Sequence, residues 1–234
     1  MLSYTVIDLE MTGLSAKVDK IIEIGAVKVA EGKIIGTYST LVNPKRPIPQ
    51  QVRELTGITD DMVRQGKSED EAVRELLTFW GEDILVGHNV GFDYSFLKQW
   101  AINHKEPLEV MACDTLKIAR GVLPAEQKKT LEALCDYFSI ERKQAHRALD
   151  DALETKEVFE RLIPLAEGSK MALLEPKPLQ YKAKRVTPAT GHQVERIKEF
   201  IRRHQIPDEI CFEALTRSEA SRIMDRYYAT YGRD

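Results

Sequence analysis

The sequence predicts an α/β protein, in which a mixed β-sheet is flanked by helices and a small α-helical region follows. Two observations carry this prediction. Three apolar segments come first, within residues 5–7, 21–29 and 34–42, and they have the length and composition of strands. Short strands then alternate with helical segments as far as about residue 166. Hairpin-connected strands followed by strand–helix alternation are typical of a mixed sheet with helices packed on it.

The individual elements follow from local patterns. A short polar break at Gly32 and Lys33 fits a hairpin turn between the second and third strands. The second strand alternates imperfectly between apolar and polar residues, as a strand buried on much of both faces would. Beyond a loop with several prolines, apolar residues recur at helical spacing. In chain order, the later elements are a helix over about 69–80, a strand at 84–86, a helix over about 93–104, a strand near 110–113, and helices over about 115–121, 130–138 and 147–166.

The composition excludes several classes of protein. The chain has 234 residues, 43% hydrophobic and 30% charged, which is ordinary for a globular protein and argues against wholesale disorder. We see no run of about 20 apolar residues and no basic signal-peptide region, so we expect a cytoplasmic protein. The three cysteines are widely spaced, which argues against a disulfide framework and a structural zinc site. No P-loop, dinucleotide fingerprint or GxSxG motif occurs.

The charge divides the chain into an acidic body and a basic tail. Residues 1–168 hold 21 Lys+Arg and 28 Asp+Glu, whereas residues 169–234 hold 13 and 9. The stretch 169–190 combines three prolines with five cations, and both features favour an extended backbone. We therefore expect a domain over 1–168, a basic linker over 169–190 and a small helical module over 191–234.

The predicted module contains two amphipathic helices, and the second opens with a capping box of Thr216 and Glu219. Residues 189–193 and 215–221 resemble a small helical module attached to several nucleic-acid enzymes. A solvated structural annex and a DNA-binding role both fit this pattern. The basic tail also motivates a hypothesis that it adds non-specific affinity for nucleic acid.

Carboxylates occur where the predicted sheet would bury them. Asp8 and Glu10 follow an apolar strand, and residues two apart on a strand point to the same face. Two like charges side by side are unfavourable in a partly dry site unless a cation neutralises them. The alternative is that the strand ends at Asp8 and that both acids face water.

Two further segments carry acids in comparable positions. Asp93 follows a short buried strand and lies at the start of a helix, where it could also serve only as an N-terminal cap. His146, Asp150 and Asp151 lie at the start of the last helix of the body. Taken alone, this segment could be a capped helix start with solvated acids.

Together these segments resemble the DEDDh 3′–5′ exonucleases, the group of the DnaQ-like proofreading (epsilon) subunit of bacterial DNA polymerase III. The resemblance covers roughly residues 3–165 and implies an RNase H-like mixed five-stranded sheet. The histidine in the third motif separates the chain from a sister group with tyrosine there. Three motifs carry the resemblance in order: Asp8-x-Glu10-x-Thr12-Gly13, His88-Asn89-x-x-Phe92-Asp93-x-x-Phe96-Leu97, and His146-x-x-x-x-Asp151.

The resemblance implies two divalent metal ions, Mg²⁺ or Mn²⁺. Asp8 would bridge them, Glu10 and Asp151 would complete one site, and Asp93 would hold metal-bound water. His146 would be the general base; the family spacing selects Asp151 over its neighbour. The chemistry agrees, because two hard cations about 4 Å apart can clamp the attacking and leaving oxygens of a phosphoryl displacement. Histidine, with an ordinary pKa near ~6.5, can take a proton from water.

Five further residues are candidates for substrate binding. Thr12 and Gly13 lie where family members hold the 3′-terminal nucleotide, although the glycine could be only a turn residue. Thr56 and Ile58 belong to a loop similar to the family segment that contacts the terminal base, with a simple helix end as the alternative. His88 could be a metal ligand, a substrate contact or a core histidine whose hydrogen bonds are satisfied, and the last two are favoured because the family places its metals on carboxylates.

The implied function is a metal-dependent 3′–5′ exonuclease that hydrolyses DNA from the 3′ end and releases nucleoside 5′-monophosphates, in replication proofreading or DNA repair. The expected partners are DNA 3′ ends and, as a candidate, a DNA polymerase subunit, with no membrane. An RNA-trimming exonuclease is the alternative, because these active-site residues do not distinguish the sugars. A non-catalytic nucleic-acid-binding or protein-binding module is disfavoured, since such a module has no need of mutually repulsive carboxylates.

Overall fold

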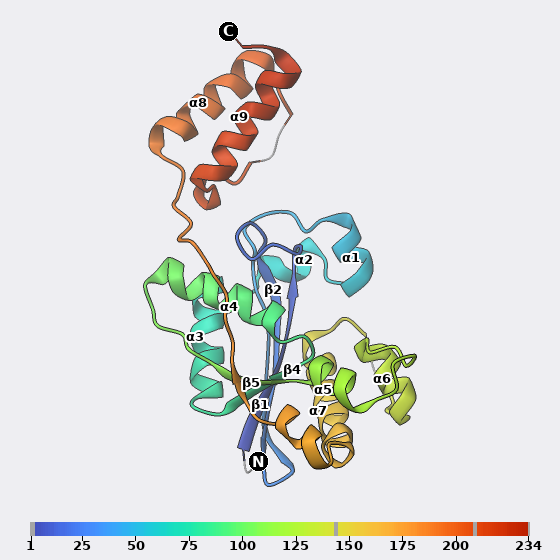
Figure 1. Cartoon of the computed structure of the whole chain (residues 1–234). Coiled ribbons are helices and arrows are strands. Elements are labelled where there is room, and N and C mark those ends of the chain that lie inside the picture. The colour runs from blue at the N-terminus through green and yellow to red at the C-terminus, as the bar shows by residue number, and fades with distance from the viewer. Residues whose placement is uncertain (1–2, 143–144, 208–209, 234) are drawn as a thin grey trace. The chain divides into compact units, whose positions relative to one another are not determined.

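The computed structural model describes residues 3–142, 145–207 and 210–233, and the chain divides into two compact units (Figure 1). The first unit comprises Met1–Pro44 and Ile48–Ala183, and the second comprises Lys45–Pro47 and Lys184–Asp234. Each unit has its own hydrophobic core. Within the described residues, no helix is both long enough and apolar enough to cross a lipid bilayer.

The first unit is built on a mixed sheet with the strand order β3-β2-β1-β4-β5-β6. Strands β1 (Ser3–Met11), β2 (Ile21–Ala30) and β3 (Lys33–Leu41) pair antiparallel, which confirms the predicted hairpins. Strand β4 (Ile84–Gly87) runs parallel to β1, and β5 (Met111–Asp114) runs parallel to β4. The mixed five-stranded sheet predicted from the sequence is therefore confirmed, and one short strand is added to it.

The added strand, β6 (Lys177–Pro178), lies in the segment that was expected to be an extended linker. It pairs antiparallel with β5, and the N–H of Leu179 donates to the carbonyl of Val110 at 2.9 Å. Leu179 and Tyr181 pack against the sheet core, and a 3₁₀-helix precedes the strand at Gly168–Leu173. The first unit thus extends to residue 183. The charge and proline pattern concealed this boundary, because the few apolar residues between the cations bind the segment to the sheet.

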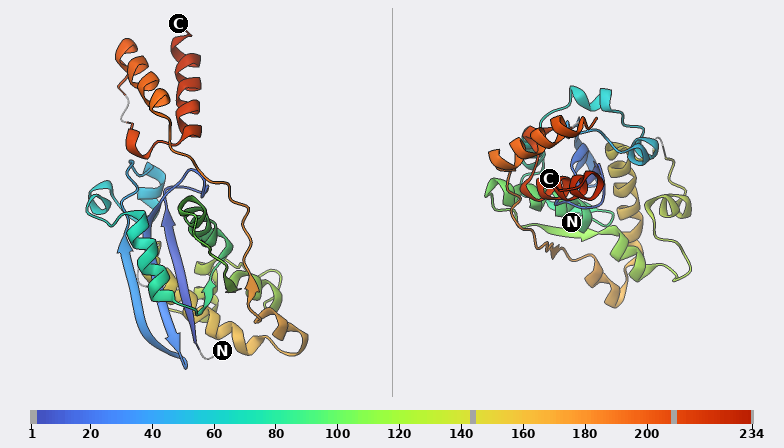
Figure 2. Two further views of the ribbon diagram at one scale, coloured as in Figure 1. Left: turned by 90° about the vertical axis from the view of Figure 1, so that its left-hand side faces the viewer. Right: turned by 90° about the horizontal axis from the view of Figure 1, so that it is seen from above.

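Helices cover both faces of the sheet (Figures 1 and 2). Helices α3 and α4 pack on one face, and α5, α6 and α7 share a core with the other. The short helices α1 and α2 lie in a region that the sequence analysis interpreted as a loop, because neither is long enough to show an apolar stripe. The helices of this unit are α1 (Gln50–Thr56), α2 (Asp60–Arg64), α3 (Glu69–Trp80), α4 (Gly91–His104), α5 (Thr115–Val122), α6 (Leu131–Phe138) and α7 (Ala148–Leu162), with a 3₁₀ turn at Ile163–Leu165.

The alternation of side chains along β1 decides which layer each residue faces. Ile7 and Leu9 belong to the core shared with α3 and α4, whereas Val6 belongs to the core shared with α7. Asp8 and Glu10 have the parity of Val6, so they project on the side that α7 covers. Because β1 continues past Glu10, the alternative in which the strand ends at Asp8 is wrong.

The second unit is a pair of helices, α8 (Gly191–His204) and α9 (Arg217–Tyr231), with a 3₁₀ turn at Phe212–Ala214. The predicted capping box of Thr216 and Glu219 is confirmed, and α8 opens with a capping box of the same kind. The apolar stripes of the two helices form one small core. That core comprises Ile197, Phe200, Leu215, Ala220, Met224 and Tyr227.

Candidate active site

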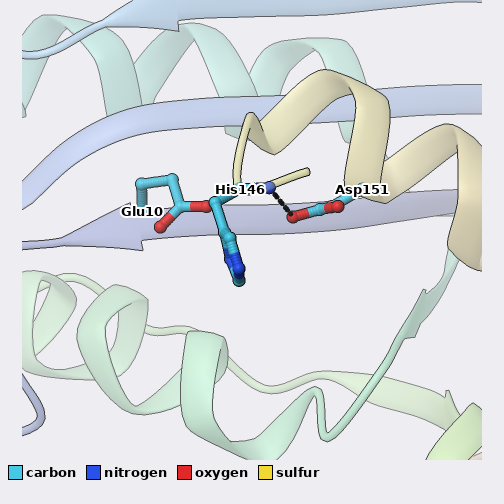
Figure 3. Close-up of side chains that lie close together, drawn as sticks. All are labelled: Glu10, His146 and Asp151. Atoms are coloured by element: carbon cyan, nitrogen blue, oxygen red, sulfur yellow. Dashed lines mark hydrogen bonds between the residues drawn. The ribbon is translucent and has the colours of Figure 1, made fainter. Parts of the chain in front are cut away.

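The candidate site lies near the end of β1, where three segments distant in the sequence meet. Strand β1 contributes Asp8 and Glu10, and α4 contributes Asp93. Asp151 lies in the first turn of α7, and His146 shortly precedes that helix. Ligand atoms of Glu10, His146 and Asp151 all lie within 4.8 Å of one another (Figure 3). The structure therefore brings residues of the first and third sequence motifs together.

Asp93 reaches the same strand through a hydrogen bond. Strand β4 pairs with β1 only as far as Val6, so the later residues of β1 have no neighbouring strand on that side. The N–H of Leu9 donates instead to Oδ1 of Asp93 at 3.1 Å. Since Leu9 lies between Asp8 and Glu10, this bond holds the Asp93 carboxylate beside both. Asp93 lies in the first turn of α4, whose N-cap is Val90, and its carboxylate also reaches β1, so it is more than a helix cap.

Asp151 is held through both of its carboxylate oxygens. The backbone N–H of His146 donates to Oδ2 at 3.1 Å, and Nη2 of Arg142 donates to Oδ1 at 3.3 Å. Nε of Arg142 also donates to Glu154 at 2.8 Å, which anchors the guanidinium. His146 has a left-handed backbone with φ of 60°, a conformation that is unfavourable for residues other than glycine and clusters at functional sites. Figure 3 shows its imidazole projecting away from the backbone contact with Asp151.

A buried ion pair fixes the start of α7 on β2. Glu23, which is 2% exposed, accepts from Nη2 of Arg147 at 2.7 Å and from the N–H of Ala148 at 3.0 Å. Gly25 permits this close approach, because a Cβ there would lie 2.1 Å from the carbonyl carbon of Ala148. The sequence analysis missed these contacts. Nothing in the sequence shows that Glu23 and Arg147, which belong to elements far apart, lie opposite each other.

The crowding of acids shifts their proton affinities. Burial, reinforced by the neighbouring carboxylates, raises the pKa of Glu10 to about 8. Burial also raises the pKa of Asp93 to about 7, and burial together with Asp93 and Glu10 holds that of Asp8 well above its usual range. The pKa of Asp151 is raised by burial, although Arg142 opposes the shift. Burial is the largest cause of each shift, because a partly dry site disfavours the charged form of a carboxyl group.

This donor set suits a hard divalent cation. Mg²⁺ and Mn²⁺ prefer oxygen ligands, and the carboxylates of Asp8, Glu10, Asp93 and Asp151 supply them. A bound cation would stabilise the charged form of these buried carboxylates, because a metal competes with protons for the same oxygens. The acidic group near Glu10 is therefore a possible metal-binding group, and the imidazole of His146 lies beside it.

Thr12 and Gly13 lie directly after β1 and help to shape the loop that follows. The hydroxyl of Thr12 accepts from the N–H of Lys20 at 2.9 Å. A Cβ at Gly13 would lie 2.6 Å from the carboxylate of Asp19, so a larger residue there would displace that side chain from its place in the loop. The role of a turn residue is supported, and contact of either residue with a nucleotide stays a prediction.

The other three substrate candidates are engaged within the fold. Thr56 ends α1, its hydroxyl accepts from the N–H of Ile58 at 3.1 Å, and the Ile58 side chain is fully buried. Nδ1 of His88 lies 2.9 Å from the hydroxyl of Thr115, and burial lowers the histidine's pKa. Among the described residues, none of the three candidates makes a hydrogen bond to the acidic cluster. Their contacts with substrate stay predictions.

Comparisons with known proteins identify relatives of the first unit. Residues 5–159 match the sequence model of the RNase_T family, described as exonuclease. A protein of Clostridium perfringens, DNA polymerase III PolC-type, is 40% identical over 156 residues. That match covers 67% of this chain but only 11% of the polymerase, so the chain corresponds to a small part of that protein. The family match ends before Lys184–Asp234, the main segment of the second unit.

Solved structures share the fold of the first unit. Exonuclease X, in complex with duplex DNA carrying a 5′ overhang, is 27% identical with a TM-score of 0.57, and the match covers 72% of this chain and 97% of that one. The nuclease domain of 3′hExo, described as a DEDDh family member bound to rAMP, is 20% identical with a TM-score of 0.60, covering 69% and 92%. The second likeness shows the fold alone. The α/β fold is therefore that of known exonucleases.

Proposed function

This chain belongs to the RNase_T exonuclease family, and from that premise we propose that it is a metal-dependent 3′–5′ exonuclease acting on DNA. It would release nucleoside 5′-monophosphates during replication proofreading or DNA repair. One observation carries the proposal: the acids of three separate motifs converge near the end of β1, with Asp93 bonded to Leu9 and Asp151 beside Glu10. A site crowded with buried carboxylates is electrostatically unfavourable unless cations bind there.

The proposed chemistry assigns one task to each side chain. Asp8, Glu10, Asp93 and Asp151 hold two divalent cations, which when bound neutralise the phosphate and activate the attacking water. His146 accepts a proton from that water at a ring nitrogen. The hydrogen bonds that fix Asp93 and Asp151 keep their oxygens in place before substrate arrives, which limits reorganisation during the reaction.

The choice of DNA rests on the relatives. The Clostridium perfringens protein is a DNA polymerase, and the Exonuclease X structure contains duplex DNA. Both support a DNA substrate, and the first supports a polymerase subunit as a partner. The sheet and its acids are equally compatible with RNA, for which the 2′-OH would be the distinguishing group.

Digestion of matched oligonucleotides tests the proposal. The full chain is incubated with 5′-labelled DNA and RNA of one sequence, each single-stranded, paired and mispaired at the 3′ end, in Mg²⁺, Mn²⁺ or chelator. We expect metal-dependent shortening of DNA from the 3′ end, release of 5′-mononucleotides, and loss of activity in Asp8→Asn. Faster trimming of RNA than of DNA would show that RNA is the preferred substrate, in place of DNA. A folded protein that cleaves neither strand with either metal would contradict the proposal.

A further inference from the structure

The second unit carries a cationic cavity that the proposed exonuclease site does not use. This open cavity on α8 and the C-terminal end of the chain has a volume of about 500 Å³. Three guanidinium groups face one carboxylate there, so the lining has a net positive charge. The residues that line it are Arg196, Glu199, Phe200, Arg203, Tyr228 and Arg233.

The aromatic ring of Tyr228 forms part of the cavity lining. The guanidinium carbon of Arg196 lies 5.5 Å from the ring centroid of Tyr228, and that of Arg233 lies 5.4 Å from it. The ring meets buried Phe200 edge-on, with centroids 5.5 Å apart and an interplanar angle of 82°. Phe200 belongs to the core of the unit, so Tyr228 packs on that core while the exposed guanidinium groups of Arg196 and Arg233 lie over its ring.

Two cations of the cavity, Arg196 and Arg233, are available to a ligand. Among the described residues, neither Arg196 nor Arg233 lies within ion-pair distance of a carboxylate. Arg203 lies 3.8 Å from Glu199, but both side chains are more than half exposed, and an exposed pair of this kind contributes little energy. A multiply charged anion can therefore bind Arg196 and Arg233 and compete with the existing contacts of Arg203.

We propose that this cavity binds a single strand of nucleic acid, with backbone phosphates on Arg196, Arg203 and Arg233 and a base against Tyr228. Guanidinium forks bind phosphate oxygens in pairs, and an aromatic ring stacks any base without regard to sequence. An acidic peptide would bind the guanidinium groups but has no base to stack on the Tyr228 ring. The choice of nucleic acid rests on the proposed exonuclease function.

The cavity supplies what the first unit lacks. Residues 1–183 hold 24 Lys+Arg and 29 Asp+Glu, so that part of the chain repels a polyanion, whereas residues 184–234 hold 10 and 8. Because both units belong to one chain, a strand bound at the second unit has a raised effective concentration at the first. The second unit is therefore a substrate-retention surface that sets affinity and leaves the hydrolytic step itself unchanged.

Binding in chelator isolates this surface from catalysis. Fluorescence anisotropy of a labelled dT oligonucleotide is measured with the full chain in EDTA at several salt concentrations. We expect Tyr228→Ala to weaken binding about tenfold or more, as loss of one base stack does, and Tyr228→Phe to retain the wild-type affinity. We expect Arg203→Ala to lower the log–log salt slope by roughly 0.7, the value for one phosphate contact on a single strand.

Arg202→Ala is the matched control. Arg202 is exposed on the same helix, its removal changes the net charge equally, and it does not line the cavity. Unchanged binding in Tyr228→Ala and Arg203→Ala would overturn the inference, as would an equal loss in Arg202→Ala. Stronger displacement of the strand by poly-glutamate than by unlabelled dT would also overturn it, in favour of an acidic protein.

A second assay separates this inference from the proposed function. Hydrolysis of a dinucleotide in Mn²⁺ needs the first unit but offers the cavity no strand to retain. We expect all cavity variants to hydrolyse the dinucleotide at the wild-type rate while binding the long strand more weakly. Dinucleotide hydrolysis together with wild-type strand binding in every variant overturns the inference alone. Absence of hydrolysis in the wild type overturns the proposed function alone, because binding in EDTA does not depend on it.

Discussion

The two units of the chain place charge in opposite ways. In the first, carboxylates contributed by elements far apart in sequence are crowded near the end of β1, and burial raises their pKa values. In the second, exposed guanidinium groups surround one aromatic ring on a two-helix unit. The acids depend on a hydrogen-bonded framework that reaches from β2 to α7, whereas the cations depend only on one helical hairpin and the residues that end it.

This difference predicts two kinds of mutational response. Buried like charges are unfavourable unless a cation neutralises them, so the first unit's acids act together and the loss of one disables the set. Exposed cations are solvated before and after binding, and each contributes a modest and additive share. We therefore expect all-or-none effects at the acidic cluster and graded effects at the basic surface.

The largest effect should separate two adjacent aspartates. Asp151→Asn removes a negative charge and one carboxylate oxygen from the proposed metal site, and the loss of several kcal/mol of charge stabilisation corresponds to roughly a thousandfold slower hydrolysis. Asp150→Asn makes the same chemical change one residue away, where the side chain lines a different cavity with Ile140 and Glu141. We expect it to retain activity within about threefold. Rates on a 3′-tailed oligonucleotide measure both, and equal losses would contradict the selection of Asp151.

The next effect concerns the ion pair that positions α7. Arg147→Met leaves Glu23 without its guanidinium partner and frees the helix that carries Asp151. Loss of such a supporting contact typically lowers metal affinity or activity about 10–100-fold. Lys156→Met is the control, because it breaks ion pairs elsewhere on the same helix.

Stability and metal affinity are measured together for these two variants. Both substitutions should lower the melting temperature, and only Arg147→Met should also weaken Mn²⁺ binding at a temperature where both proteins are folded. Equal Mn²⁺ affinities in the two variants would show that the ion pair between Glu23 and Arg147 is a purely structural contact.

A smaller effect should appear in the pH dependence of stability without metal. The pKa of Glu10 rises from an ordinary 4.5 to about 8, so the folded protein binds more protons than the unfolded chain between these values. Stability therefore falls as the pH rises through this range. Glu10→Gln cannot ionise, so its melting temperature should match the wild type at pH 5.5 and exceed it by at least about 3 °C at pH 9.

Tryptophan fluorescence reports this transition without interference from the second unit. Trp80 and Trp100 are the two tryptophans of the sequence, and both belong to the first unit. Mn²⁺ should restore the stability of the wild type at pH 9. A difference between wild type and variant that does not change with pH would show that Glu10 ionises as an ordinary carboxyl group.

The smallest effect is expected at the junction of the units. Lys182, Lys184 and Arg185 are exposed, and their joint replacement by alanine should lower the salt slope of strand binding by up to about 2. Substitution is preferable to truncation after Gly168, because removal of residues 169–183 would also delete β6 and its packing on the sheet. Equal salt slopes of strand binding in the variant and the wild type would show that this segment is a simple spacer.

Sequence periodicity was sufficient to predict much of the first unit. Alternation along β1 placed Asp8 and Glu10 on one face, and the predicted helix over 69–80 coincides with α3. Such patterns are readable because each depends on neighbours within a few residues. The convergence of Glu10, His146 and Asp151 followed from family resemblance, since periodicity alone does not bring separate segments together.

The features that escaped prediction depend on tertiary contacts. Glu23 belongs to a family-like segment of the second strand, but only the fold places Arg147 opposite it. Strand β6 was concealed by its cations and prolines, although Leu179 beside it packs into the core. The cavity around Tyr228 likewise arises from the pairing of Arg196 on α8 with that ring on α9.

Direct titration with Mn²⁺ tests the central claim, that the acids near the end of β1 hold divalent cations. Electron paramagnetic resonance counts free Mn²⁺ as the full chain is titrated at pH 8, with Asp8→Asn and Asp150→Asn compared in parallel. We expect saturable binding of two Mn²⁺ ions per wild-type chain, unchanged binding in Asp150→Asn, and weaker binding with fewer ions in Asp8→Asn. Absence of saturable binding by the folded wild type, or identical titrations for Asp8→Asn and the wild type, would contradict the claim.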